Sequence, residues 1–363
     1  MFLPALLLRD YGWWGFVVFA VPNVVGAAAM GWVLRPGASE AILARHRPMC
    51  EAFSLATIAF QAYFIFGLAF RASGGPNWAG YAAVVAGLVL TIILMLLLKR
   101  RFRAAGAAIW CVSVAVGIWL LPSGGLAEAR KAFSDVGSKN GLDLLALAPV
   151  CCFGFALCPY LDLTFHRVRR ENSAAGARTA FTLGFGVLFF AMILITCLYA
   201  PWFTGGDATS ALPMVLIVLV GIHLGLQAGY TEFVHTIEAP PKAGFAAVAG
   251  MLIALLASAP NNPLAMHSLS AFEVVYRVFM SLYGLVFPAY VWLMMIPTRD
   301  GHNGMAGVAG RAKLRIFAVA VGVAIPMYAI GFIARHETWL FPGLGIVMLA
   351  RLFLPRGQAA TAQ

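Results

Sequence analysis

The side chains in this sequence that could do chemistry are few, and most lie inside long apolar segments. Asn23, Gln61, His223 and Gln227 each stand well inside such a segment. At membrane depth an amide or ionisable side chain is costly unless it faces the interior of a helix bundle or a wet cavity. His223 and Gln227 are four residues apart and share one helix face. We therefore predict that these four side chains line a solute-binding cavity. The alternative for Asn23 and Gln61 is that they form hydrogen bonds between helices.

A second group of candidate residues lies in a segment interrupted by Pro149 and Pro159. Each proline removes a backbone hydrogen bond from a helix, so we expect a kink or an unwound patch. In a membrane, unwound backbone survives only where it is buried in protein or lines a cavity, and transporters place solute and ion sites at such breaks. We predict that Cys158, Tyr160 and Asp162 contact a solute at this break. A plain proline kink without a ligand is the alternative.

Two pairs of residues have spacings that metal sites use, Asp162-x3-His166 and Glu232-x2-His235. Both pairs are expected on the same side of the membrane, so four ligands could converge. A di-iron bundle needs two Glu-x-x-His pairs, however, and this sequence has one. Basic residues also follow His166 directly and would repel a cation. We therefore predict no metal and no cofactor.

The other reactive residues have structural interpretations. Glu273 and Arg277 are four residues apart and are predicted to form an ion pair on one helix face. The six cysteines lie inside or at the edge of apolar segments, where neither a disulfide framework nor a zinc ribbon is expected. The sequence has no Gly-rich phosphate loop and no Gly-x-Ser-x-Gly nucleophile motif. These patterns give little support to an enzyme.

Composition predicts that the segments carrying these residues are membrane helices. Of 363 residues, 62% are apolar and 11% are charged, whereas a soluble domain needs more charge to cover its surface. The apolar runs are continuous and show no alternation of period two, which favours helices over a barrel. We predict one all-α domain over residues 1–363, a polytopic bundle of about eleven spans. They are expected at about 11–34, 49–71, 78–98, 104–121, 143–165, 178–200, 212–235, 243–260, 271–297, 314–334 and 338–354.

The basic residues predict the orientation of the bundle. In membrane proteins the cytoplasmic loops between helices carry an excess of Lys and Arg. If the spans are placed as above, 18 of the 25 Lys and Arg residues fall on one side and six on the other, with Arg277 inside a helix. We therefore expect the N-terminus outside, without a cleaved leader, and the C-terminus in the cytoplasm. The net charge of +11 is explained by this orientation and does not indicate nucleic-acid binding.

Residues 153–182 carry a resemblance to a known family. A proline-broken helix rich in small residues is followed by LDLTFHRVRRE at 161–171 and by AAGARTA at 174–180, which leads into a new span. This pattern is similar to the discontinuous first helix of the second repeat, with the loop after it, in the amino acid/polyamine/organocation transporter superfamily, which includes the sodium:solute symporters. The resemblance implies that this helix enters from outside and ends inside. It also implies that 158–162 corresponds to the family's substrate-binding break.

The expected helix order departs from that family at one point. Five helices precede the broken one in the family, whereas four are expected here. The helix without a counterpart is the family's first broken helix, which carries half of its substrate and sodium site. Such a chain could be a degenerate or non-transporting relative.

Three functions are consistent with these patterns. The leading hypothesis is a secondary transporter or permease for a small solute, with a coupling ion, in the cell (inner) membrane, because of the broken helix and the sparse polar residues at mid-depth. A membrane-embedded enzyme or redox protein could instead use the His and carboxylate residues of 143–165 and 212–235. The third hypothesis is a non-transporting structural or assembly protein of the lipid bilayer, with no substrate.

Overall fold

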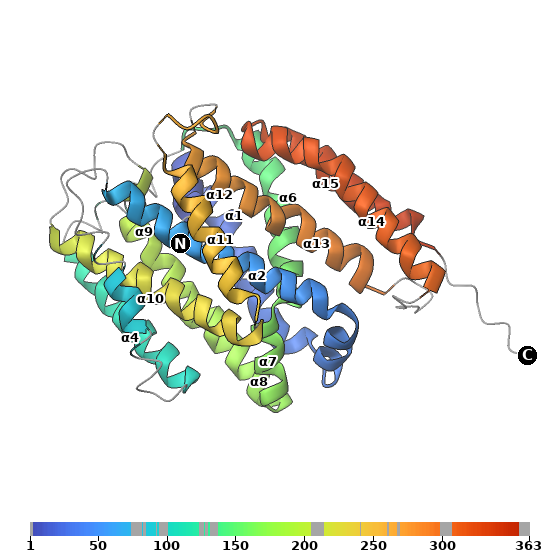
Figure 1. Cartoon of the computed structure of the whole chain (residues 1–363), viewed down its shortest axis with the longest axis horizontal. Helices are drawn as coiled ribbons and strands as arrows, with labels where there is room; N and C mark the ends of the chain where they lie inside the picture. Colours follow the sequence, from blue (N-terminus) through green and yellow to red (C-terminus); the bar gives the residue numbers. More distant parts are fainter. Residues whose placement is uncertain are drawn as a thin grey trace, which may run out of the picture.

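The computed structural model describes residues 3–73, 82, 85–91, 93, 101–122, 127, 130, 137–204, 214–239, 241–259, 261–266, 269–297 and 307–355. Within these residues the chain folds into α-helices with short 3-10 and π-helical turns, and no strand is present. Figure 1 shows the long helices running roughly alongside one another as a bundle. The all-helical architecture predicted from the apolar runs is therefore confirmed.

The helices begin and end as follows. In the first half of the chain they are α1 (Leu3–Val33), α2 (Ala38–Ser73), α4 (Phe102–Leu120), α6 (Gly141–Leu157), α7 (Leu163–Glu171), α8 (Ala174–Phe181) and α9 (Phe190–Thr204). In the second half they are α10 (Met214–Glu238), α11 (Ala243–Ala257), α12 (Ala271–Ser281), α13 (Phe287–Tyr290), α14 (Gly307–Tyr328) and α15 (Leu340–Ala350). Turns of π-helix continue the helical path at Thr182–Phe189, Leu282–Val286, Val291–Met295 and Ala329–Ile333.

Seven helical segments among the described residues are long and apolar enough to cross a membrane. They are Leu3–Val33, Ala38–Gly67, Phe102–Leu120, Gly141–Leu161, Ala174–Ala200, Ala271–Met295 and Gly310–Ile333. The chain is thus a multi-pass membrane protein by length and composition of its helices. The expected span at 78–98 lies largely outside the described residues. The total of about eleven spans stays a prediction.

Several expected helix boundaries differ from the structure. The helix expected over 49–71 begins at Ala38, and the one expected over 314–334 begins at Gly307. The first helix was expected over 11–34 but begins at Leu3. The added residues form a separate short helical segment before Gly12, which the span prediction did not include. The fifth helix was expected to be continuous over 143–165. It instead ends at Leu157, continues as a 3-10 turn over Cys158–Leu161, and a separate helix starts at Leu163.

The leading part of α1 is joined to the rest by a sharp bend. Gly12 has φ 60° and ψ −149°, which only glycine adopts readily, so residues 3–11 and 13–33 are two helical segments. The backbone of the segment 137–139 lies against the first of them: the Lys139 amide donates to the Asp10 carbonyl oxygen at 2.8 Å. A Cβ at Gly137 would lie 2.5 Å from the Tyr11 Cα, so the approach also requires glycine.

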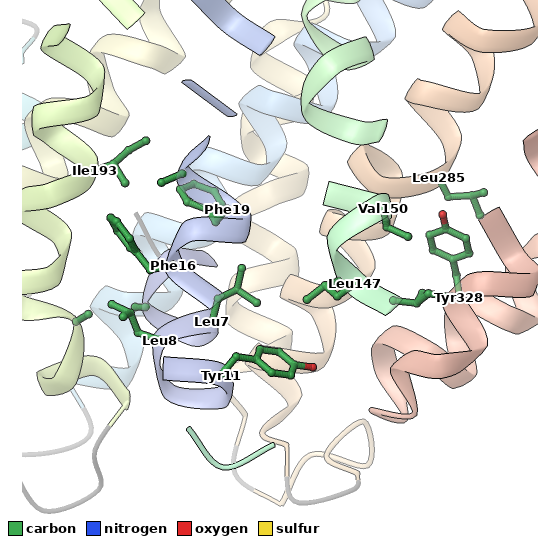
Figure 2. Packing of buried hydrophobic residues seen from close by; sticks show 14 of the residues in the cluster. Leu7, Leu8, Tyr11, Phe16, Phe19, Leu147, Val150, Ile193, Leu285 and Tyr328 are labelled. Carbon is green, nitrogen blue, oxygen red and sulfur yellow. The ribbon is translucent and has the colours of Figure 1, made fainter. Parts of the chain in front are cut away.

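The small residues of α1 bring neighbouring helices close. A Cβ added at Gly26 would lie 2.2 Å from the Phe155 carbonyl oxygen of α6, and one at Gly31 would lie 3.1 Å from the Ala177 carbonyl oxygen of α8. In lipid, helices associate through such close packing, because apolar side chains gain nothing by leaving the lipid. Figure 2 shows the resulting core, in which Leu7 of α1 lies in one cluster with Leu147 of α6.

One end of the bundle is organised by α7, and we call it the α7 end. Arg169 is buried and donates to the Leu34 carbonyl oxygen at 2.7 Å, which caps the end of α1. Arg103 donates to Asn172 at 2.8 Å, and Arg167 pairs with Glu238 at 3.1 Å. The ends of α1 and α10 and the start of α4 therefore meet at α7, which lies with α8 at the bottom of Figure 1.

The opposite end holds an ion network around Asp10, and we call it the Asp10 end. Arg277 binds Glu273 at 2.8 Å and Asp10 at 3.3 Å. Arg9 binds the same two carboxylates, at 2.9 Å and 2.8 Å respectively. Arg335 reaches Asp10 at 3.1 Å. The predicted Glu273–Arg277 pair is therefore present, but as part of a network of five residues from α1, α12 and the segment after α14.

We predict unequal losses from the two members of that pair. Glu273→Gln should lower the free energy of unfolding by about 3 kcal/mol or more, because it leaves Arg9, Arg277 and Arg335 around the one carboxylate of Asp10. Arg277→Gln should cost less, because two cations then balance two carboxylates. Unfolding by SDS titration in mixed micelles measures both.

The exposed pair of Arg47 and Glu51 supplies the control for this comparison. Arg47→Gln should cost about 0.3–0.5 kcal/mol, as is usual for pairs at i, i+4 on a helix surface. Equal losses for the two network variants, with recovery in the double variant, would show instead that Glu273 and Arg277 act as an isolated pair.

Candidate functional site

A cavity of about 1180 Å³ lies inside the bundle. Its wall is built by α1, α2, α4, α6, α9 and α10, by 276–284, and by the end of α14. The lining extends from Leu3 and Leu7, near the Asp10 end, to Arg103 and Phe165 at the α7 end. A space of this size exceeds the 300–1,000 Å³ usual for small-molecule sites, so it is large enough to hold a solute.

Helical periodicity places regular faces of two helices on this cavity. On α2 the lining residues recur at intervals of three and four and are Phe53, Thr57, Phe60, Gln61, Phe64 and Ile65. On α10 the corresponding residues are His223, Leu224, Gln227, Ala228, Tyr230, Thr231, Val234 and His235. The face shared by His223 and Gln227 was predicted from their spacing, and it does line the cavity.

The broken segment between α6 and α7 forms another part of the wall. Asp162 has an extended backbone with ψ 109° and acts as the N-cap of α7. Its Oδ1 accepts hydrogen bonds from the Thr164 backbone amide at 2.8 Å and from the Thr164 hydroxyl at 2.7 Å. The Cys158 thiol donates to the Tyr283 carbonyl oxygen at 3.3 Å. The break is therefore held by hydrogen bonds within the chain.

His166 ties the same break to α2. Its Nε2 lies 2.9 Å from the Tyr160 carbonyl oxygen and its Nδ1 lies 3.1 Å from the Ser39 hydroxyl. Because a carbonyl only accepts, Nε2 carries a proton and donates to Tyr160. Burial holds the pKa of this imidazole below its usual range and so favours the neutral ring, in which Nδ1 accepts from the Ser39 hydroxyl. His166 is thus a structural residue of the break.

On the α10 face, unlike the break, the polar side chains use only part of their hydrogen-bonding capacity. Gln227 donates to Ser113 of α4 at 2.8 Å through its amide nitrogen. The His223 side chain is buried, and its Nδ1 has no hydrogen-bond partner within the described residues. The Tyr199 ring lies edge-on to the imidazole, with centroids 5.9 Å apart. The imidazole therefore sits in an aromatic setting with unused hydrogen-bonding capacity.

The structure brings five of the seven predicted solute-binding residues to the cavity and leaves two outside it. Gln61, Cys158, Asp162, His223 and Gln227 belong to the lining. Asn23 is half-buried on α1 and does not belong to it. Tyr160 is half-buried, packs against two apolar clusters and does not belong to the lining.

The metal alternative needs at least three ligands close together. In the part of the chain that the structure describes, no three His, Cys, Asp or Glu side chains lie together in this way. Asp162 and His166 are occupied by the contacts above. His235 lies 3.1 Å from the Ser54 hydroxyl through Nδ1. The two spacings that suggested a metal are thus accounted for at three of their four residues by hydrogen bonds within the bundle.

Sequence reasoning missed the aromatic part of the lining. Phe60 lies 5.6 Å from Tyr276 and 6.5 Å from Tyr283 between ring centroids, and all three line the cavity. Tyr283 also lies 2.9 Å from the Thr57 hydroxyl, which donates to the Phe53 carbonyl oxygen. The regular spacing of Phe53, Thr57, Phe60 and Phe64 could have revealed this face.

Comparison of the chain with family models, with curated proteins and with solved structures found no match. The resemblance of residues 153–182 to a transporter superfamily therefore stays a prediction.

We predict that Asp162 acts through its oxygen as a cap. Asp162→Ala should lower the free energy of unfolding by about 1 kcal/mol, as loss of an N-cap does, whereas Asp162→Asn keeps an accepting oxygen and should cost much less. Ser173→Ala, which removes the N-cap of α8, is a matched control outside the cavity. Thermal unfolding in detergent measures all three. An Asn variant as unstable as the Ala variant would show that the negative charge is needed.

Proposed function

We propose that the chain is a secondary transporter or permease for a small solute. The observation that carries this proposal is the cavity of about 1180 Å³ inside the bundle. Its wall contains both the interrupted helix and the His223–Gln227 face. An unwound segment at membrane depth beside a cavity is the arrangement that transporters use for solute sites.

The same proposal includes the coupling ion and the family. The break at 158–162 lies where the resemblance to the amino acid/polyamine/organocation superfamily places a substrate contact, and Asp162 is the acidic residue of the break. A coupling ion is an expectation from that resemblance. The described lining supplies carboxylate oxygen for a cation only at Asp162, and one of these oxygens already caps α7.

The proposed orientation has the N-terminus outside and the C-terminus in the cytoplasm, across about eleven spans of the inner membrane. Charge at the two ends supports it. Arg9, Lys139 and Arg335, which sequence places outside, all lie at the Asp10 end and all pair with carboxylates. Arg103 and Arg169, which sequence places inside, lie at the α7 end and bind amide or backbone oxygens instead. This difference supports a cytoplasmic α7 end, although Arg167 at that end pairs with the carboxylates of Glu171 and Glu238.

Access to the cavity from both sides tests the transporter proposal. In a background with the six native cysteines replaced by alanine, Gln61→Cys and Gln227→Cys should react with a small charged methanethiosulfonate applied to either side of oriented vesicles. A cavity that opens alternately to the two sides requires this. Ile193→Cys, fully buried in the core and outside the lining, is the unreactive control. Reaction from neither side, or from one side only, would refute the proposed alternating access.

The orientation has its own test in the same background. Ala265 lies between α11 and α12 and Ala174 begins α8, and both are exposed. A membrane-impermeant thiol reagent applied to intact cells should label Ala265→Cys and should not label Ala174→Cys until the cells are opened. Labelling of Ala174→Cys from outside would reverse the proposed orientation.

A further inference from the structure

The polar groups of the cavity differ in whether the chain already satisfies them. Asp162, Cys158 and His235 bond to other groups of the bundle. Tyr230 donates to the Phe102 carbonyl oxygen at 3.1 Å. The hydrogen-bonding capacity left over is therefore concentrated on a few uncharged groups.

Gln61 of α2 is one of these groups and is half-buried; the fully buried one is the imidazole of His223. It lines the cavity, the residue is 2% exposed, and its Nδ1 has no partner among the described residues. A buried polar atom is normally hydrogen-bonded, so one without a described partner calls for an explanation, and the head group of an occupant would supply one. One turn further along α10, the amide of Gln227 uses its nitrogen on Ser113, and its oxygen remains available in the cavity. The two side chains offer an adjacent donor and acceptor set on one helix face.

The charges of the lining restrict what this set can bind. Among the described lining residues, full charges are present only on Arg103 and Asp162, and both are near the α7 end. Arg103 is bonded to Asn172 and Asp162 caps α7. An ionised solute beside His223 would thus lie near aromatic rings without a counter-charge from the described lining residues, which is unfavourable.

The rest of the wall is apolar and largely aromatic. Phe60, Tyr276 and Tyr283 form one group of packed rings, and Phe185 and Phe189 contribute another, with centroids 5.7 Å apart. Rings arranged in this way favour flat apolar bodies, which stack on their faces or meet their edges. The volume of about 1180 Å³ is sufficient for a body of several rings.

We propose that the ligand of this cavity is a neutral, mainly aromatic or apolar molecule whose single hydrogen-bonding head group is held by His223 and Gln227. This inference rests on the proposed function, and it adds the chemical class of the solute. His223 accepts from or donates to the head group through its neutral ring, and Gln227 supplies the second bond.

Four biphenyls that differ in one group test the inference. They are 4-phenylphenol with a hydroxyl, 4-methoxybiphenyl without a donor, the anion biphenyl-4-carboxylate and the cation 4-phenylbenzylamine. Binding to the full-length protein in lipid nanodiscs is measured by equilibrium dialysis at pH 7, with protein-free nanodiscs subtracted. We expect saturable binding of the phenol, about tenfold tighter than binding of either ion and several-fold tighter than binding of the methyl ether, because one hydrogen bond is lost.

Variants identify the groups responsible. His223→Phe retains a ring of similar size, and it should bring the ratio of phenol to methyl-ether affinity close to one. Gln227→Leu should reduce the same ratio and provides an independent variant if the first fails to fold. Thr236→Val, on an exposed position of α10 outside the lining, should leave the ratio unchanged.

The outcomes separate this inference from the proposed function. Tighter binding of either ion, an unchanged ratio in both variants, or no saturable binding of the phenol would overturn the inference. If His223 holds only an ordered water, the ratio will not respond to its replacement. The transporter proposal is judged separately by the two-sided reactivity of Gln61→Cys and Gln227→Cys, which does not depend on the solute.

Discussion

The cavity wall at the Asp10 end depends on one interaction, the burial of Asp10 beside three guanidinium groups. Asp10 is 2% exposed, and it is bonded from α1, α12 and the segment after α14. A buried carboxylate is tolerable only when cations surround it, so these segments must stay together. The network thereby fixes residues 3–11, and Leu3, Pro4 and Leu7 of that segment line the cavity. In lipid, where apolar contacts alone give little preference for one arrangement, such a network supplies specificity.

At the α7 end, hydrogen bonds to backbone groups without helical partners hold the segments together. The break before α7 leaves carbonyl and amide groups without helical partners, and Asp162, His166 and Arg169 bind them or the nearby end of α1. Each of these residues is polar at or near the membrane surface, and each is satisfied. The cavity therefore lies between two ends that are held by polar contacts, while its own wall is mostly apolar.

How far the sequence predicts this arrangement depends on the separation of the residues in the chain. The helices, the break at 158–162 and the shared face of His223 and Gln227 follow from local spacing and from proline chemistry. The Asp10 network does not, because Arg335 lies 325 residues from Asp10 and only tertiary packing brings them together. The position of Tyr160 does not follow from local spacing either, because it packs against clusters whose residues come from α1, α2 and α13.

The distribution of satisfied and unsatisfied groups also decides between two roles for the broken helix. If the break itself were the binding site, its free backbone groups and Asp162 would be expected to await a ligand. Instead the chain bonds Asp162 Oδ1, the Tyr160 carbonyl oxygen and the Cys158 thiol internally. The buried atom of the cavity wall without a described partner is on α10, at His223. Under the proposed function, these contacts favour a break that shapes the cavity and clears space beside it, with much of the hydrogen bonding to an occupant coming from the face of α10.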